Sequence, residues 1–233
     1  MSSFEQGGGL WVAATPIGNL GDVSERLRTT LDTVDVIACE DTRHTAKLLN
    51  HLGLNRLLEA YHDHNETAKA QTLADRIEAG ERVALVSDAG TPAISDPGFR
   101  LVRECRKRGL PVTPIPGPCA LTAVLSASGL PTDQFFFRGF LKPKSAARLA
   151  FFEAHREAEF TLALYESTHR IEKMAAEMLQ IFGPERVVCF AREITKQFET
   201  ILTGPLVSVV PQIQGRGAKG EFTVLIAPAR FSL

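Results

Sequence analysis

Two short stretches of this chain concentrate side chains that move protons or hold anions. CEDTRHT (Cys39–Thr45) and YHDHNE (Tyr61–Glu66) are rich in acids and histidines. Carboxylates and imidazoles act as general acids and bases near neutral pH, and a guanidinium such as that of Arg43 can hold a phosphate through two parallel hydrogen bonds. Asp41, Arg43 and His64 are therefore candidate active-site residues, and each can equally have a structural role, as His64 would by hydrogen-bonding a neighbouring loop.

Metal-binding patterns are weak in this sequence. His62 and His64 flank Asp63, and alternate residues of an extended segment face one side, but no further strong ligand accompanies the two histidines. The cysteines are scattered without a C-x-x-C pair, which argues against a zinc knuckle and against a disulfide framework; they are Cys39, Cys105, Cys119 and Cys189. We therefore expect no metal site and a reduced, cytoplasmic setting.

Three loops rich in Gly and Pro follow expected strands in the first half of the chain. They are TPIGNL (Thr15–Leu20), SDAGTPAISDPG (Ser87–Gly98) and PGPCA (Pro116–Ala120). In open α/β sheets, ligands bind beyond the carboxyl ends of the strands, and glycine lets backbone groups approach a ligand closely. Any one loop can simply turn the chain, but three together predict a ligand site. The chain has no phosphate-loop motif, and its Gly7–Gly9 run precedes a strand, so neither common nucleotide-binding fingerprint is present.

The elements that must position these loops are short apolar runs alternating with amphipathic stretches. The expected strands of the first half are Leu10–Ala14, Val34–Ala38, Val83–Val86 and Val112–Ile115. The expected helices between them are Val23–Leu31, Thr42–Leu52, Glu66–Ala79 and Phe99–Arg108. Strand followed by helix, repeated, predicts a mostly parallel sheet covered by helices.

The character of the sequence changes at SGLPTD (Ser128–Asp133), which we take as the boundary between domains at 1–130 and 131–233. The strands expected after it are Phe135–Phe140, Thr161–Tyr165, Val187–Ala191, Thr200–Leu202 and Phe222–Ala227, with helices at Ser145–Glu157 and Thr168–Phe182. Because these elements alternate less regularly, we expect a mixed second sheet. The predicted fold is two α/β domains with a ligand cleft between them.

Composition narrows the class of protein. The 233 residues are 44% hydrophobic and 23% charged, which is ordinary for a globular protein. A net charge of −1 argues against a protein that holds naked nucleic acid by charge alone. No apolar run approaches the ~20 residues needed to span a bilayer, so we expect no membrane contact. The first nine residues lack the regions of a signal peptide and are expected to form a short leader.

Eight motifs, in order, carry a family resemblance. They are TPIGNLGDVSER, IACEDTRHTAKLL, YHDHNE, LVSDAGTPAISDPG, PGPCALTAVLSASGLP, GFLKPK, LYESTHRI and FAREITKQFE. Over Leu10 to Ile226 the chain resembles the small-subunit ribosomal RNA cytidine-2′-O-methyltransferase family, a branch of the tetrapyrrole methylase superfamily. Members that match this pattern continue into a short helical extension, whereas this chain ends at Leu233. Two explanations are open: the chain is a truncated version, or its RNA contacts are arranged differently.

The resemblance implies a homodimeric methyltransferase that binds S-adenosylmethionine between two α/β domains and modifies a cytidine ribose in the decoding region of small-subunit RNA. The RNA is expected within the assembled subunit. The implied cofactor-binding residues are Pro16, Asp88, Ala89, Gly90, Ala93, Ile94, Pro116, Gly117, Cys119, Ala120, Tyr165, Glu166, Ala191, Arg192, Gly220 and Phe222. The resemblance also favours a substrate-facing loop in which Lys196 meets RNA phosphate or eases deprotonation, beside the active-site candidates Asp41, Arg43 and His64.

Two other functions remain open at this point. A methyltransferase of the same architecture that acts on a small molecule such as a tetrapyrrole would share the cofactor loops of the first domain. The stretches CEDTRHT, YHDHNE and FAREITK resemble the RNA branch specifically and favour RNA. A module that binds the cofactor or the ribosome without turnover is the second alternative, and methyl transfer distinguishes it.

Overall fold

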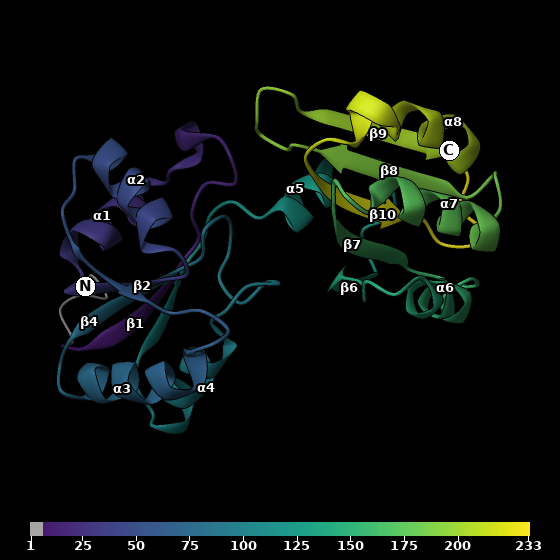
Figure 1. Ribbon diagram of the computed structural model, residues 1–233. Helices are drawn as coiled ribbons and strands as arrows, with labels where there is room; N and C mark the ends of the chain where they lie inside the picture. The colour runs from purple at the N-terminus through teal and green to yellow at the C-terminus, as the bar shows by residue number, and fades with distance from the viewer. Residues whose placement is uncertain (1–6) are drawn as a thin grey trace. The chain divides into compact units, whose positions relative to one another are not determined.

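A computed structural model describes residues 7–233, without the side chains of residues 216 and 217, so most of the expected leader lies outside the described residues. The chain forms two compact units, Met1–Cys119 and Ala120–Leu233 (Figure 1). The sequence placed this division later, at 130/131. The intervening residues form helix α5 (Ala120–Ala127), whose contacts are with the second sheet.

The first unit is a doubly wound parallel sheet. Its strands are β1 (Gly9–Ala13), β2 (Val36–Cys39), β3 (Leu57–Ala60), β4 (Arg82–Val86) and β5 (Val112–Ile115). Its helices are α1 (Glu25–Thr33), α2 (Thr42–Leu52), α3 (Glu66–Glu78) and α4 (Phe99–Lys107), with the short 3-10 turn η1 (Leu20–Asp22). The strand order is β3-β2-β4-β1-β5 and every pairing is parallel, as the alternation of strands and helices predicts.

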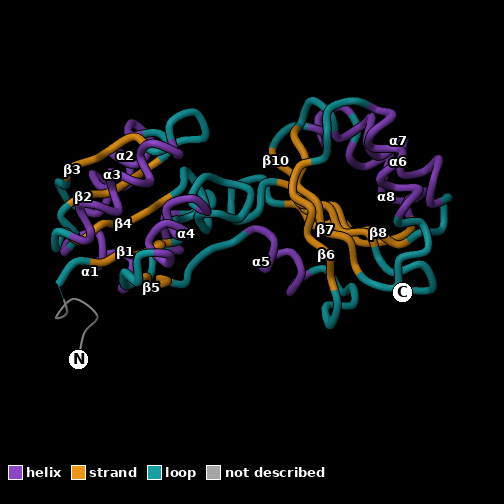
Figure 2. Tube along the Cα trace, turned by 90° about the horizontal axis from the view of Figure 1, so that it is seen from below, coloured by secondary structure: helices purple, strands orange, loops and turns teal. Residues whose placement is uncertain are grey.

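Alternating side chains of this sheet build two separate cores. Leu10 and Leu85 point to the face covered by α3 and α4, where they pack with Leu73. Trp11 and Ile37 point to the opposite face, which α1 and α2 cover. Because both faces are covered, the strands are apolar throughout rather than alternately polar. Figure 2 shows the strands of this unit between purple helices.

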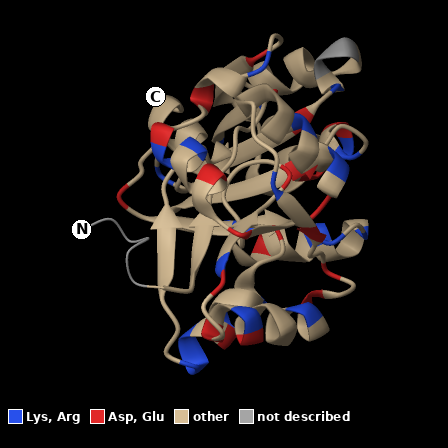
Figure 3. Ribbon diagram, turned by 90° about the vertical axis from the view of Figure 1, so that its left-hand side faces the viewer, with Lys and Arg blue, Asp and Glu red and all other residues tan. Residues whose placement is uncertain are grey.

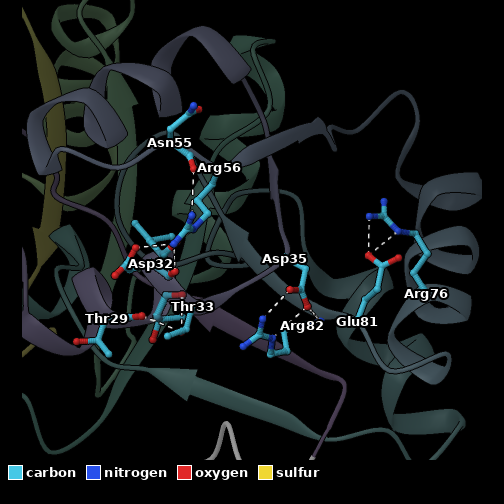
Figure 4. Close-up of polar contacts among 11 residues, drawn as sticks. Thr29, Asp32, Thr33, Asp35, Asn55, Arg56, Arg76, Glu81 and Arg82 are labelled. Carbon is cyan, nitrogen blue, oxygen red and sulfur yellow. Dashed lines mark hydrogen bonds and ion pairs between the residues drawn. The ribbon is translucent and has the colours of Figure 1, made fainter.

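Ion pairs gather at the amino ends of these strands (Figure 4). Arg82, the first residue of β4, donates from Nη2 to the Asp35 carboxylate just before β2 at 2.6 Å, and its backbone N–H donates at 2.8 Å. The side-chain hydrogen bond from Arg82 holds the pKa of Asp35 below its usual range. Arg76 pairs with Glu81 at 2.6 Å. These contacts neutralise the amino edge and join the elements that enter the sheet.

The second unit contains a mixed sheet, as expected. Its strands are β6 (Phe135–Phe140), β7 (Thr161–Ser167), β8 (Val187–Arg192), β9 (Thr200–Pro205) and β10 (Glu221–Ile226), in the order β6-β7-β10-β8-β9. Only the β6–β7 pairing is parallel among the pairings described. The helices are α5, α6 (Ser145–Ala154), α7 (Ile171–Phe182) and α8 (Leu206–Val209), with 3-10 turns η2 (Val210–Ile213) and η3 (Gly215–Ala218).

The two faces of this sheet are covered differently. Helices α6, α7 and α8 bury one face, where Phe152 and Met174 pack with strand residues such as Phe190. Helix α5 lies on the other face (Figure 2), and its first turn is fixed because the backbone N–H of Leu121 donates to the Tyr165 hydroxyl at 3.1 Å. No described helix is long and apolar enough to cross a bilayer.

Candidate functional site

The three Gly/Pro loops predicted from the sequence meet at the carboxyl edge of the first sheet. Thr15, after β1, forms a two-way backbone bridge with Gly90, after β4, at 2.9 and 3.1 Å. The Thr91 hydroxyl donates to the carbonyl of Pro118, after β5, at 3.1 Å. Strands β4, β1 and β5 are adjacent in the sheet. The loops therefore form one connected surface at the edge where open α/β sheets bind ligands.

Glycine is required where these loops touch. Gly90 has φ +84°, and an added Cβ would lie 3.2 Å from the Ile17 side chain. A Cβ on Gly117 would lie 3.0 Å from that of Ala14. Ala93 and Ser95 are held at φ 69° and 66°, a region that residues with a side chain seldom adopt. Such held, unfavourable backbone is commonly found at ligand sites.

Asp88 links the β4 loop to the end of β2. Its Oδ1 accepts from the backbone N–H of Asp41 at 3.0 Å. Asp41 in turn caps α2, since its Oδ1 accepts from the backbone N–H of Arg43 at 2.8 Å. The Arg43 guanidinium also binds the Asp41 carboxylate, at 2.7 and 3.1 Å, and these hydrogen bonds hold the pKa of Asp41 well below its usual range. Two candidates, Asp41 and Arg43, are thus paired with each other.

Two further carboxyl groups share this edge. Burial raises the pKa of Asp96 to about 6, against a hydrogen bond from Ser87 and with repulsion from Asp88 and Asp63. Burial also raises the pKa of Glu40, and repulsion from Asp88 and Asp96 adds to it. No ion pair joins Glu40, Asp88 or Asp96 to a cation in the part of the chain that the structure describes. The edge therefore carries uncompensated negative charge.

The YHDHNE stretch follows β3 and is mostly structural. The Tyr61 hydroxyl accepts from the backbone N–H of Leu101 at 3.1 Å, and burial raises the pKa of Tyr61 to about 12. Asn65 closes the turn by accepting from the backbone N–H of His62 at 2.9 Å. His64 is exposed, with its ring centroid 5.9 Å from that of His62. Within residues 7–233, no three His, Cys, Asp or Glu side chains gather as a metal site.

The candidates of the second unit lie in two neighbouring rows on strands β7, β10 and β8. Glu166, Phe222 and Arg192 stand opposite one another in register. Tyr165 and Ala191 are in the next row, on either side of Thr223. Successive residues of a strand point to opposite faces, so Tyr165 faces α5 whereas Glu166 and Phe222 face the buried helix layer. Side chains of the two rows therefore cannot line one surface.

Glu166 is the buried charged member of these rows. Its Oε1 accepts from the backbone N–H of Ser167 at 2.7 Å and from Nε of Arg170 at 2.8 Å. Its Oε2 is buried and has no hydrogen-bond partner among the described residues. Arg170 is the N-cap residue of α7, so Glu166 fixes the start of that helix.

Lys196 lies in the β8–β9 loop between two carboxylates. Its Nζ donates to Glu221 at 2.7 Å and to Glu193 at 3.1 Å. Burial alone would lower the pKa of Lys196, but these hydrogen bonds outweigh it and raise the pKa. Gly220 makes the arrangement possible, because a Cβ there would meet the Glu193 side chain at 2.5 Å. Lys196 is thus a fixed cation and a poor proton acceptor.

The remaining candidates lie in the loops of the first unit or at the start of α5. Those of the first unit all lie in the three connected loops: Ala89, Ala93, Ile94, Pro116 and Gly117 are exposed, and Pro16 and Cys119 are half-buried. Ala120 is the first residue of α5 and belongs to the second unit. Asp96 was not predicted from the sequence. The pattern that could have indicated it is its position as an acidic residue inside the longest Gly/Pro loop.

Known proteins resemble this chain in sequence and in fold. The family model for tetrapyrrole (corrin/porphyrin) methylases matches residues 9–209. A ribosomal RNA small subunit methyltransferase I of Vibrio cholerae serotype O1 is 50% identical over 93% of this chain and 76% of its own length. The enzyme of that name from Escherichia coli O157:H7 is 47% identical over 94% and 77%. This chain belongs to the tetrapyrrole methylase family.

Within that family, the methylase described here belongs with the small subunit methyltransferase I proteins, as the eight motifs indicated. Solved structures show the same fold at low identity. The methyltransferase CobJ superposes with a TM-score of 0.71 at 20% identity, covering 97% of this chain and 96% of its own. A Thermus thermophilus uroporphyrin-III C-methyltransferase complexed with S-adenosyl homocysteine gives 0.64 at 16% identity, covering 95% and 98%.

Proposed function

We propose that this protein transfers a methyl group from S-adenosylmethionine to the ribose 2′-oxygen of a cytidine in the decoding region of small-subunit ribosomal RNA. The observation that carries the proposal is the 50% identity, across 93% of the chain, to a ribosomal RNA small subunit methyltransferase I. The cytidine and its 2′-oxygen rest on the motif resemblance. A homodimer acting in the cytoplasm on the assembled subunit belongs to the same proposal.

The chemistry of the first-unit edge fits the cofactor. S-adenosylmethionine carries a sulfonium and an ammonium, and Glu40, Asp88 and Asp96 supply negative charge that no described cation offsets. The bridged loops add backbone groups that can bind a nucleoside and a carboxylate. We assign cofactor binding to Asp88 and to the loops that contain Gly90 and Gly117. A fold neighbour was solved with S-adenosyl homocysteine, which supports this assignment.

When bound, the cofactor supplies a methyl group already activated on sulfur, so the protein has to align the acceptor oxygen and remove its proton. Asp96 is our candidate for the proton step, because it lies in the strained loop after β4 beside Ser95 and burial raises its pKa. The proton of the 2′-hydroxyl would pass to the Asp96 carboxylate. Lys196 stays protonated between Glu193 and Glu221, and we assign it to substrate binding on the motif resemblance.

The test is transfer of labelled methyl from S-adenosylmethionine to purified small ribosomal subunits that lack the modification. Nuclease digestion and mass spectrometry then locate the label, and fully modified subunits serve as the control. We expect one labelled cytidine that carries the methyl group on its ribose. Label on a base, or on another nucleotide, overturns the position that we assign.

The same experiment separates the alternatives. A methyltransferase for tetrapyrroles would leave the subunits unlabelled and methylate a porphyrinogen added in their place. A binding module would take up S-adenosylmethionine, as calorimetry measures, and label neither substrate. Either result contradicts the proposal.

A further inference from the structure

Strand β6 ends the second sheet on one side (Figure 1), and several of its phenylalanines are exposed. Phe135, Phe136 and Phe140 are 45%, 40% and 50% exposed, respectively. Apolar rings are normally buried, and a row of them on an edge strand would promote association unless something covers it. Phe135, Phe137 and Phe140 stand opposite alternate residues of β7 and therefore lie on one face of the sheet; we call these three residues the aromatic edge.

Two rings of the aromatic edge are held in place by an aromatic neighbour. Phe137 and Phe140 pack on Tyr165, with ring centroids 5.0 and 5.8 Å apart. Phe136 is not part of this surface, since it points to the opposite face and stacks there on His155, with ring centroids 5.7 Å apart. Phe140 is therefore fixed on one side by Tyr165 while half of its surface stays exposed. A flat partner can stack on such a ring without first ordering it.

Cations accompany these rings. Arg138, Lys142 and Lys144 are exposed, and within the described residues none of them forms an ion pair. The sequence contains no Asp or Glu between Asp133 and Glu153, so this stretch is locally basic in a chain of net charge −1. We call Arg138, Lys142 and Lys144 the basic flank.

On helix α4 an exposed phenylalanine also lies near basic residues, but two of those basic residues form ion pairs with acids. Phe99 is 64% exposed there, but Arg100 pairs with Glu66 at 2.6 Å and Arg108 with Asp75 at 2.5 Å. Figure 3 shows basic and acidic segments interspersed along the helices of the face in view. The basic flank has no such partner among the residues described, and it adjoins the aromatic edge in the chain.

We propose that the aromatic edge and the basic flank form a binding surface for single-stranded RNA, with bases stacked on the exposed rings and phosphates on the basic flank. Stacking rings beside unpaired cations are the usual elements of such surfaces. The inference rests on the proposed function, since it assigns part of the RNA substrate to this strand. It concerns RNA outside the methylated nucleotide.

A second copy of the chain fits this edge less well. Pairing of two edge strands needs a regular row of free backbone groups. The register of β6 with β7 shifts between Phe137 and Gly139, so Arg138 is an extra, bulged residue in the middle of the strand. Bulges and central charges are features that prevent edge-to-edge pairing.

The test measures binding of a fluorescently labelled, unstructured RNA of about 12 nucleotides and of a duplex with the same sequence. Phe135→Ala and Phe140→Ala should each weaken single-strand binding by roughly 5- to 100-fold, and Phe140→Trp should retain it. The matched controls are Phe99→Ala and Arg103→Glu on α4, which should bind as the wild type does. Thermal unfolding verifies that each variant is folded.

The basic flank is tested by salt dependence. Replacing Arg138, Lys142 and Lys144 together by Gln should reduce the slope of log Kd against log salt by about 2, since each phosphate contact to a single strand contributes roughly 0.7. An unchanged slope, unchanged affinity in the Phe variants, or equal preference for the duplex overturns the proposal. Variants that instead shift the sedimentation coefficient of the protein show a contact between copies and also overturn it.

Methyl transfer by the same variants separates this inference from the proposed function. If the wild type methylates subunits and the variants do so with unchanged KM, the function stands and the RNA surface is refuted. If RNA binding depends on both residue sets but no methyl transfer occurs, the surface stands and the function is refuted. If the wild type neither binds the RNA nor transfers methyl groups, the RNA surface and the proposed function are both refuted.

Discussion

The carboxylate of Asp88 accepts a hydrogen bond at 3.0 Å from the backbone N–H of Asp41, 47 residues earlier in the chain. The bond joins the loop after β4 to the start of α2, across the neighbouring ends of β2 and β4. One oxygen of Asp88 thus supports the fold of the edge, while its charge is available to a cationic ligand. Two substitutions separate these roles.

Asp88→Asn retains an oxygen acceptor and removes the charge, whereas Asp88→Ala removes both. We expect both variants to weaken S-adenosylmethionine binding by roughly tenfold or more, because hydrogen bonds to charged groups contribute about 1.5–3 kcal/mol. Only Asp88→Ala should also lower the unfolding temperature. Calorimetry measures the affinity, with Asp133→Asn, an exposed loop acid, as the control. Wild-type affinity in Asp88→Ala would remove this residue from the site.

Asp96 should make stability depend on pH in the acid range. Its pKa is about 6 in the folded protein against 3.8 ordinarily, mainly because it is buried. Between these values the folded state binds more protons than the unfolded state, so the free energy of unfolding falls as pH rises from about 4 to about 6. Asp96→Asn stays neutral, so its stability advantage over the wild type should appear across that window. Urea titrations at several pH values measure it, and parallel curves for the two proteins would contradict the assignment.

Much of the fold was predictable because local signals and packing agree. In the first unit, β5 and α2 have the predicted bounds, and the six other predicted elements differ only by a residue or two at their ends. Strand β3 was missed because it is an edge strand, with Leu57 exposed and no residue fully buried, so its sequence has no strand pattern. Helix α5 was missed because it is short and follows a Gly/Pro loop directly.

The site was predictable at the level of loops and not of side chains. Asp41 was chosen as an acid in a reactive-looking stretch, and its sequence alone did not reveal that its carboxylate caps α2 and binds Arg43. Tyr165 and Glu166 are consecutive in β7 and point to opposite faces, but which of them faces the helix layer is decided by tertiary packing. The raised pKa of Asp96 depends on burial by distant residues, and no sequence pattern reports that.

The buried ion pair between α6 and α7 should be essential for stability. Arg148 donates to Glu177 at 2.6 and 2.7 Å, and their side chains are 1% and 7% exposed. Arg148→Met leaves the Glu177 charge buried and unpaired, so we expect a loss of about 3–5 kcal/mol in the free energy of unfolding. Combining it with Glu177→Leu should recover much of that loss.

Urea denaturation measures this effect, and the exposed pair of Arg156 and Glu153 provides the control. Glu153→Gln should change the free energy of unfolding by less than about 1 kcal/mol, since exposed pairs contribute little. A double variant at Arg148 and Glu177 no more stable than Arg148→Met would show that the uncompensated charge is not the cause.

Lys196 should act on the RNA substrate and not on the cofactor. Held by Glu193 and Glu221, it stays protonated and presents a fixed cation. We expect Lys196→Ala to reduce kcat/KM for methylation of subunits by roughly tenfold, which is about 1.4 kcal/mol, with unchanged affinity for S-adenosylmethionine. Lys196→Arg should retain most activity, since it preserves the charge, and Lys173→Ala on exposed α7 surface is the control. Because a cation is required and not a base, raising the pH from 7 to 9 should not rescue Lys196→Ala. Normal turnover in Lys196→Ala, or a parallel loss of cofactor affinity, would show that the β8–β9 loop does not contact the substrate in this way.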